Sequence, residues 1–192
     1  ASMDAILEAR ASRRAIDPEG LKVRSWVKPG TAIALLVDRS GSMGGKPLAT
    51  SAMAAAAVAW RSPEDYSVIA FGKDVVVAKG QTSTKSGEQV VNDVLALRGF
   101  GTTDLAGALL AAGDQLSRTR AGRRITVILS DCRATVEGDV QAAARALDEV
   151  VILAPLGDDA EARVLASQVG ARIACIDGPS DIPSALQTVL GD

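Results

Sequence analysis

The chain has 192 residues, which is long enough for one sizeable α/β core and too short for a second. Hydrophobic residues make up 47% of it and aromatic residues only 3%, so Ala, Val, Leu and Ile must build the core. The formal net charge of −2 indicates neither a nucleic-acid partner nor attraction to an anionic membrane. The chain contains no His, which excludes Ser-His-Asp hydrolysis, Cys-His proteolysis and His-ligated zinc.

The first 30 residues are expected to form an arm or cover, ahead of one domain at residues 31–192. Turn residues stand at Asp17-Pro18-Glu19-Gly20. Residues 21–26 then alternate apolar and polar side chains, as in an edge strand or an extended arm, and Trp26 is expected to pack on the domain. No apolar run reaches the ~20 residues of a membrane span, and no signal-peptide pattern is visible. We therefore expect no membrane insertion.

The first core strand is predicted where the chain is continuously apolar, from Ile33 to Val37. It ends at Asp38, and the next residues, Arg39-Ser40-Gly41-Ser42-Met43, bring hydroxyls and a glycine before Pro47 starts a helix. Open α/β sheets bind their ligands at the carboxyl ends of such strands. One carboxylate and two hydroxyls can converge there, and hard cations such as Mg²⁺ prefer oxygen ligands. The turn alone supplies too few ligands, so further ones are needed downstream.

Beyond this turn, helices and strands alternate along the chain. Only two residues separate Phe71 from Asp74, which forces an antiparallel hairpin, and Ser86 is a plausible helix cap. The alternation predicts an α/β fold: a doubly wound, mostly parallel six-stranded sheet with one antiparallel edge strand and helices on both faces. The expected helices are 47–60, 86–97, 105–116, 140–147, 160–169 and 182–190, and the expected later strands are 66–71, 74–78, 125–130, 150–154 and 171–176.

Two more oxygen ligands stand where one element gives way to the next. Thr103 lies in Gly101-Thr102-Thr103-Asp104, just before a helix, and Asp131 closes the apolar run that starts at Ile125. Asp104 itself is expected to be a helix-start carboxylate. The alternative interpretation of the first turn is a polar cap on the helix that follows it, which is a common role for Ser and Asp.

These three pieces together resemble the von Willebrand factor type A (vWA) domain family, with its Rossmann-like fold. They are Asp-x-Ser-x-Ser after a first strand, a Thr-Asp pair that opens a later helix, and an Asp that ends a fourth strand. The resemblance extends from about residue 31 to residue 190. It implies a metal-ion-dependent adhesion site (MIDAS), in which three hydroxyls contact the ion and two aspartates act directly or through water. The implied residues are Ser40, Ser42 and Thr103, with Asp38 and Asp131.

The chain departs from the family pattern at two neighbours of the implied ligands. Thr102 and Cys132 stand where the family often has Gly, so local geometry is affected more than metal binding. Cys132 could be redox-active, but buried cysteines are usually inert. The two cysteines, Cys132 and Cys175, fall in or beside different predicted strands, which favours reduced thiols and a cytoplasmic location.

The resemblance implies a binding domain and not an enzyme. The expected cofactor is Mg²⁺, with Mn²⁺ or Ca²⁺ as alternatives, and a protein partner would complete its shell with an Asp or Glu carboxylate. The chain looks most like the bacterial intracellular vWA domains associated with MoxR-type AAA+ ATPases, which would make it an adaptor between such a motor and a client. One alternative is a metal-dependent hydrolase or phosphotransferase that uses the same cluster. Another is an extracellular adhesion module.

Two nucleotide or hydrolase motifs fail at the same turn. The residues from Gly41 to Lys46 have three residues between the first glycine and Gly-Lys, where a phosphate loop needs four, and Pro47 follows. A Gly-x-Ser-x-Gly elbow fails because Ser40 occupies its first glycine position and because no His could activate a serine.

Overall fold

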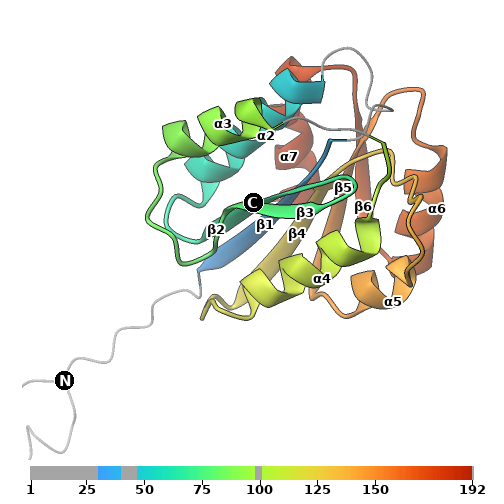
Figure 1. The fold of residues 1–192 in the computed structure, drawn as a ribbon, viewed down its shortest axis with the longest axis horizontal. Helices are drawn as coiled ribbons and strands as arrows, with labels where there is room; N and C mark the ends of the chain where they lie inside the picture. The colour runs from blue at the N-terminus through green and yellow to red at the C-terminus, as the bar shows by residue number, and fades with distance from the viewer. Residues whose placement is uncertain (1–29, 40–46, 98–100, 192) are drawn as a thin grey trace, which may run out of the picture.

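The computed structural model describes residues 30–39, 47–97 and 101–191 (Figure 1). Within these ranges six strands form one sheet in the order β3-β2-β1-β4-β5-β6. Four of the five neighbouring pairs are parallel, and only β3 runs antiparallel, beside β2. The predicted fold class is therefore confirmed. The strands are β1 Thr31–Asp38, β2 Tyr66–Phe71, β3 Val75–Lys79, β4 Arg123–Leu129, β5 Glu149–Pro155 and β6 Arg172–Ile176.

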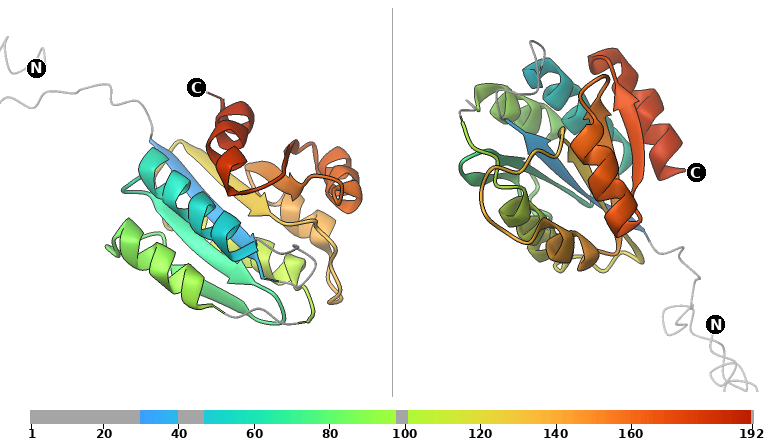
Figure 2. Two further views of the ribbon diagram at one scale, coloured as in Figure 1. Left: turned by 90° about the horizontal axis from the view of Figure 1, so that it is seen from above. Right: turned by 90° about the vertical axis from the view of Figure 1, so that its right-hand side faces the viewer.

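Helices cover both faces of the sheet (Figures 1 and 2). One apolar cluster joins the sheet to α2 (Pro47–Arg61), α3 (Gly87–Ala96) and α7 (Ile182–Leu190), and α7 follows the short 3-10 helix η3 (Pro179–Asp181). The other cluster joins the sheet to α4 (Leu105–Leu116), α5 (Val140–Arg145) and α6 (Ala160–Val169). No helix in the described ranges is long and apolar enough to cross a membrane.

The central strand β1 is buried on both faces, as its continuous apolar sequence predicts. Because successive side chains of a strand point to opposite faces, its residues divide between the two clusters. Those in the cluster of α4 are Ala32, Ala34 and Leu36, and those in the cluster of α2 are Ile33, Leu35 and Val37.

Several element boundaries differ from the sequence prediction by one or two residues, and β1 already begins at Thr31. β4 begins at Arg123, two residues early, because both arginines at its start find acids on neighbouring segments. Arg123 forms an ion pair with Glu149 at 2.7 Å, and Arg124 forms one with Asp148 at 2.7 Å. Helix α5 ends at Arg145, two residues before its predicted end. The cap at Ser86 is confirmed, as part of a reciprocal capping box.

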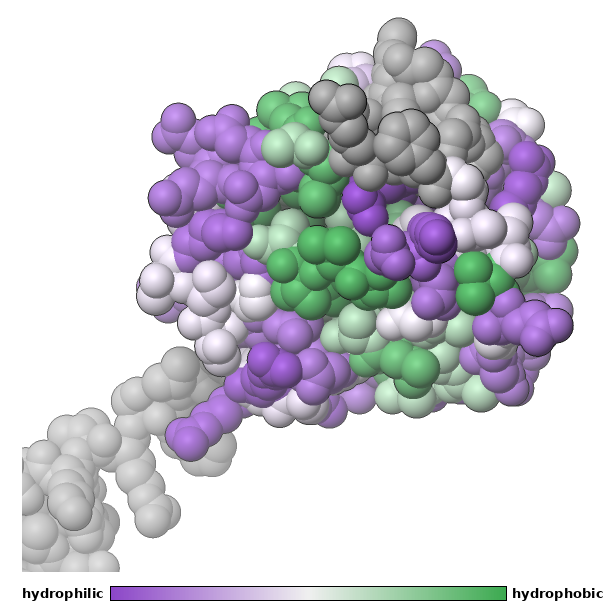
Figure 3. Space-filling view, in the orientation of Figure 1, coloured by the Kyte–Doolittle hydropathy of each residue, from purple (hydrophilic) through white to green (hydrophobic). Residues whose placement is uncertain are grey.

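The two edges of the sheet lie away from the predicted site. β3 forms one edge, where Val76 and Val77 are exposed, and the apolar area at the centre of Figure 3 lies over this strand. β6 forms the other edge. The chain leaves β1 toward β2 on one side and enters β4 on the other, so the strand order reverses between β1 and β4. Such a switch point opens a crevice at the carboxyl ends of the two strands, where ligands bind in open α/β sheets.

Candidate metal centre

Asp38 is fixed at this switch point by the neighbouring strand. Val37 is in parallel register with Leu129, so the residues that follow them, Asp38 and Ser130, meet at the same edge of the sheet. The Ser130 hydroxyl donates a hydrogen bond to Oδ2 of Asp38 at 2.5 Å, and both side chains are buried. The carboxylate therefore ends a core strand without reaching bulk water, where a charge is costly unless hydrogen bonds or a cation compensate it.

Asp131 is held by a tight turn directly after β4. Cys132 adopts a left-handed backbone with φ of 62°, which is uncommon for residues other than glycine. Its N–H donates to the Ser130 hydroxyl oxygen at 2.9 Å, so Ser130 contacts both acid-bearing segments. The Arg133 N–H donates to Oδ1 of Asp131 at 3.0 Å. A left-handed backbone favours glycine, so Cys132 holds a conformation here that a glycine would adopt more easily.

The second carboxylate oxygen of Asp131, Oδ2, is the atom that most directly suggests a bound cation. Asp131 is 1% exposed, and its Oδ2 is buried without a hydrogen-bond partner among the described residues. An unsatisfied buried acceptor costs about 1–3 kcal/mol, and more when it is charged. A bound cation would remove that cost, so the oxygen fits the role of a metal ligand, direct or through water.

Thr103 is tied to the segment that follows Asp131. Its N–H donates to the Thr135 hydroxyl oxygen at 2.7 Å, and its carbonyl accepts from the N–H groups of Thr135 and Val136 at 3.1 and 3.3 Å. The residue is 3% exposed. Three hydrogen bonds therefore join the loop before α4 to the connection after β4 at the carboxyl end of the sheet.

Asp104 is a helix cap, as predicted. Its Oδ1 accepts from the Gly107 N–H at 2.8 Å, and its own N–H donates to the Gly72 carbonyl at 2.9 Å. The N–H of Arg39 donates to the carbonyl of Phe71 at 2.8 Å. The last residue of β2 thus supports the residue after Asp38, and Gly72, which follows β2, supports the start of α4.

The electrostatics of the site are negative. Burial raises the pKa of the Cys132 thiol to about 12, with further contributions from the charges of Asp131 and then Asp38. The thiol is therefore protonated at neutral pH, which supports an inert Cys132. Both carboxylates thus act on the same buried thiol.

The predicted ligand set is described in part. Asp38, Thr103 and Asp131 lie at one end of the sheet. The segment that carries Asp131 holds the other two, because Ser130 binds Asp38 and Thr135 binds Thr103. Ser40 and Ser42 lie outside the described residues, as do the glycine turn and Trp26. Within the described ranges no group of three or more His, Cys, Asp or Glu residues could hold a metal ion. A metal ion held at this site would thus need hydroxyl ligands together with the two acids.

The supporting residues were not predicted from the sequence. Ser130 holds Asp38, Thr135 holds Thr103, and the Gly72 carbonyl holds the start of α4. Ser130 carried a weak signal, because it is a polar residue between an apolar strand and the predicted ligand. Thr135 and Gly72 carried none that distinguishes them from ordinary loop residues.

These features define an α/β domain with buried acidic and hydroxyl side chains at its topological switch point. A family model for the von Willebrand factor type A domain matches residues 33–134, which is more than half of the chain. The chain belongs to the von Willebrand factor type A domain family. No protein of curated function matches it.

Solved structures share the fold at low sequence identity. Manganese-loaded TRAP protein of Plasmodium vivax is 14% identical, with a TM-score of 0.66 over 85% of this chain and 74% of that one. Conserved hypothetical protein BatB of Bacteroides thetaiotaomicron is 14% identical, with a TM-score of 0.67 over 84% of this chain and 97% of that one. Proximal thread matrix protein 1 of the mussel byssus, with a zinc-occupied MIDAS motif, is 14% identical, with a TM-score of 0.66 over 85% of this chain. The chain spans 48% of the length of the mussel protein.

Proposed function

We propose that the domain is a metal-dependent protein-binding module and not an enzyme. Its MIDAS would consist of Asp38, Ser40, Ser42, Thr103 and Asp131, and its ion would be Mg²⁺, with Mn²⁺ or Ca²⁺ as alternatives. The observation that carries the proposal is the buried, unpartnered Oδ2 of Asp131. Two of the structural neighbours hold manganese or zinc, the zinc at a MIDAS motif, which supports a divalent ion at this place in the fold.

The arrangement suits binding better than catalysis. When bound, the ion would supply a positive charge with a coordination position open to a carboxylate of a partner protein. Asp38 is already engaged by Ser130, and the Cys132 thiol is held protonated, so neither is arranged as a free nucleophile. The roles left to the two acids are to attract and orient the cation.

Sequence resemblance extends the proposal to the partner. We place the domain with the bacterial intracellular vWA domains associated with MoxR-type AAA+ ATPases, as an adaptor between such an ATPase and a client. A cytoplasmic location is part of this proposal, and it is supported by the free state of Cys132 and Cys175.

Metal binding is tested directly by calorimetry with MgCl₂ and MnCl₂. Asp38→Ala is expected to weaken binding without unfolding the domain, whereas Glu137→Gln, which changes an exposed acid of the β4–α5 connection, is expected to bind like the wild type. Equal affinities of Asp38→Ala and the wild type would refute the proposed centre. Hydrolysis of a generic phosphate ester that disappears in Asp38→Ala would instead favour the hydrolase alternative.

Partner binding is tested with the purified MoxR-type ATPase of the native organism. Retention on the immobilised domain is expected to require the divalent ion, and Thr103→Ala is expected to lower partner affinity more than metal affinity. Retention that is unchanged by chelator, or unchanged in Thr103→Ala, would show that the docking surface lies elsewhere.

A further inference from the structure

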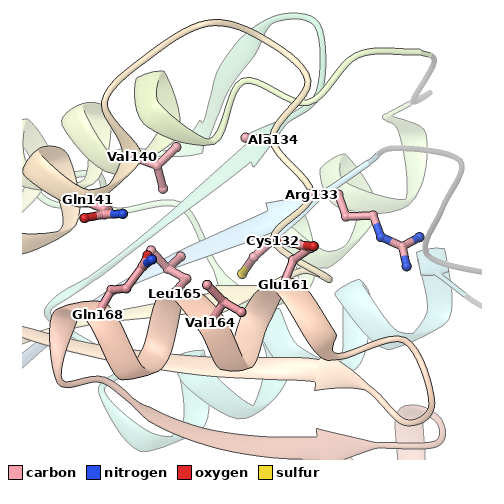
Figure 4. A pocket seen from close by; sticks show the side chains of 9 residues that line it. All are labelled: Cys132, Arg133, Ala134, Val140, Gln141, Glu161, Val164, Leu165 and Gln168. Carbon is pink, nitrogen blue, oxygen red and sulfur yellow. The ribbon is translucent and has the colours of Figure 1, made fainter.

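A cavity of about 350 Å³ lies between the loop that follows β4 and helix α6 (Figure 4). We call it the α6 pocket. Its apolar lining comes from Cys132, Val140, Val164 and Leu165, and its polar lining includes Glu161. This volume lies within the range of small-molecule and side-chain binding pockets. The role proposed above for the metal centre does not use the pocket.

The pocket shares a wall with the metal centre. Cys132, which lines it, directly follows Asp131, and the Cys132 N–H is bonded to the same Ser130 hydroxyl that binds Asp38. The two sites therefore meet at consecutive residues of one segment, Asp131 and Cys132. This proximity in the chain is the basis for asking whether one partner segment uses both sites.

The charges around the pocket leave one acid uncompensated. Arg133, also in the lining, forms an ion pair with Asp158, which offsets its positive charge. At the Gln168 end of the pocket, Arg145 is engaged with the Gln168 carbonyl at 2.9 Å. Glu161 forms no ion pair with any residue that the structure describes, and it lies at the exposed start of α6.

The apolar walls complement this single charge. Leu165 and Cys132 are buried, whereas Val164 is 49% exposed and offers its surface to a ligand. Long basic side chains bury their methylene stems along apolar surface while the charged head reaches an acid. The α6 pocket offers both apolar surface for such a stem and an acid, Glu161, for the charged head.

We propose that the α6 pocket receives a Lys or Arg side chain from the same partner that supplies the metal-binding carboxylate. The stem packs against Val164 and Leu165, and the cationic head meets Glu161. This inference rests on the proposed function, because the partner is placed by its acid at the ion. It narrows the partner's recognition segment to an acidic residue with a basic residue near it in sequence.

The test uses acetylated peptides with one Asp and one Arg, at separations of one to about four residues, which span the short distances that an extended chain covers. Each is compared with a peptide that has citrulline, a neutral isostere, in place of Arg. Binding is followed by amide chemical shifts at saturating MgCl₂. The wild type is expected to prefer the Arg peptide roughly two- to fivefold at the best separation, as for an exposed ion pair.

Two variants that each lose one negative charge test whether the preference for the Arg peptide comes from the pocket. Glu161→Gln is expected to abolish it. Glu137→Gln removes an exposed acid of the adjacent connection that does not line the pocket, and it is expected to retain the preference. Equal affinity for Arg and citrulline peptides at every separation would overturn the proposal, and so would a preference that survives in Glu161→Gln.

The experiment can distinguish a wrong proposal for the pocket from a wrong proposal for the metal centre. If no peptide binds in a magnesium-dependent way, the proposed function is wrong, and n-butylguanidinium then probes the pocket by itself. Shifts of the Val164 and Gln168 amides that disappear in Glu161→Gln support a cation-accepting pocket. The absence of such shifts overturns it.

Discussion

Replacement of Asp131 by Asn tests the link between the buried acid and the ion. Asn keeps an oxygen for the bond from the Arg133 N–H, and it removes the charge on the buried oxygen that has no described partner. We expect the variant to be more stable than the wild type without metal. We also expect it to lose most of the stabilisation that magnesium confers on the wild type.

The expected magnitudes follow from the burial of this one oxygen. An unsatisfied buried group costs about 1–3 kcal/mol. Because the Asn amide also needs an acceptor, we take the lower end, a gain of about 1 kcal/mol. For a domain of this size, that corresponds to a rise in Tm of about 2–4 °C. Magnesium at about 100 times its Kd should add about 2.7 kcal/mol to the stability of the wild type.

Thermal unfolding followed by circular dichroism, in EDTA and in MgCl₂, measures both effects. Glu137→Gln is the control for loss of an exposed negative charge, and its Tm is expected to follow the wild type in both buffers. The reasoning is refuted if Asp131→Asn is less stable than the wild type in EDTA and still gains as much from magnesium. That result would mean that the carboxylate stabilises the fold by itself and does not bind the ion.

Three further predictions concern the framework. Ser86→Ala removes the capping-box hydroxyl at the start of α3 and should cost about 1 kcal/mol in urea unfolding, and an unchanged midpoint would show that the cap adds nothing. Gly138→Ala places a Cβ 2.6 Å from the Ala106 Cβ and should cost about 1–3 kcal/mol, whereas Gly178→Ala, which meets open space, should cost less than the Gly138 change. Burial lowers the pKa of Lys79 in the folded state, so its charged form destabilises the fold below that pKa, and the cost is relieved as pH rises toward the unfolded value of about 10.4. The free energy of unfolding of the wild type should therefore rise relative to Lys79→Met between about pH 7 and about pH 10, and a constant difference would contradict this assignment.

The order of elements could be predicted because its signals are local. The apolar run of β1, the short hairpin between β2 and β3 and the cap at Ser86 each depend on residues within a few positions of one another. The early start of β4 could not be predicted in this way. Arg123 and Arg124 pair with Thr31 and Ala32 of β1, and acids on neighbouring segments accept their charges.

The candidate ligands were predictable for a similar reason. Asp38, Thr103 and Asp131 each stand at the boundary of an element, and three such boundaries agree with one family pattern. The residues that hold these ligands could not be predicted, because each hydrogen bond joins two residues that are far apart in the sequence. Ser130 and Asp38 are 92 residues apart, and Thr103 and Thr135 are 32 apart.

The sequence by itself thus determined the alternation of strands and helices, the single antiparallel pair and the boundary positions of the oxygen ligands, since periodicity and turn chemistry act over short distances. The tertiary structure decided which polar groups are paired and which are not. Among the described residues, Oδ2 of Asp131 has no hydrogen-bond partner, and Glu161 lines the α6 pocket without an ion pair. Hydrogen bonds and ion pairs depend on which distant segments meet at the switch point between β1 and β4, and packing of the two cores against the sheet brings those segments together.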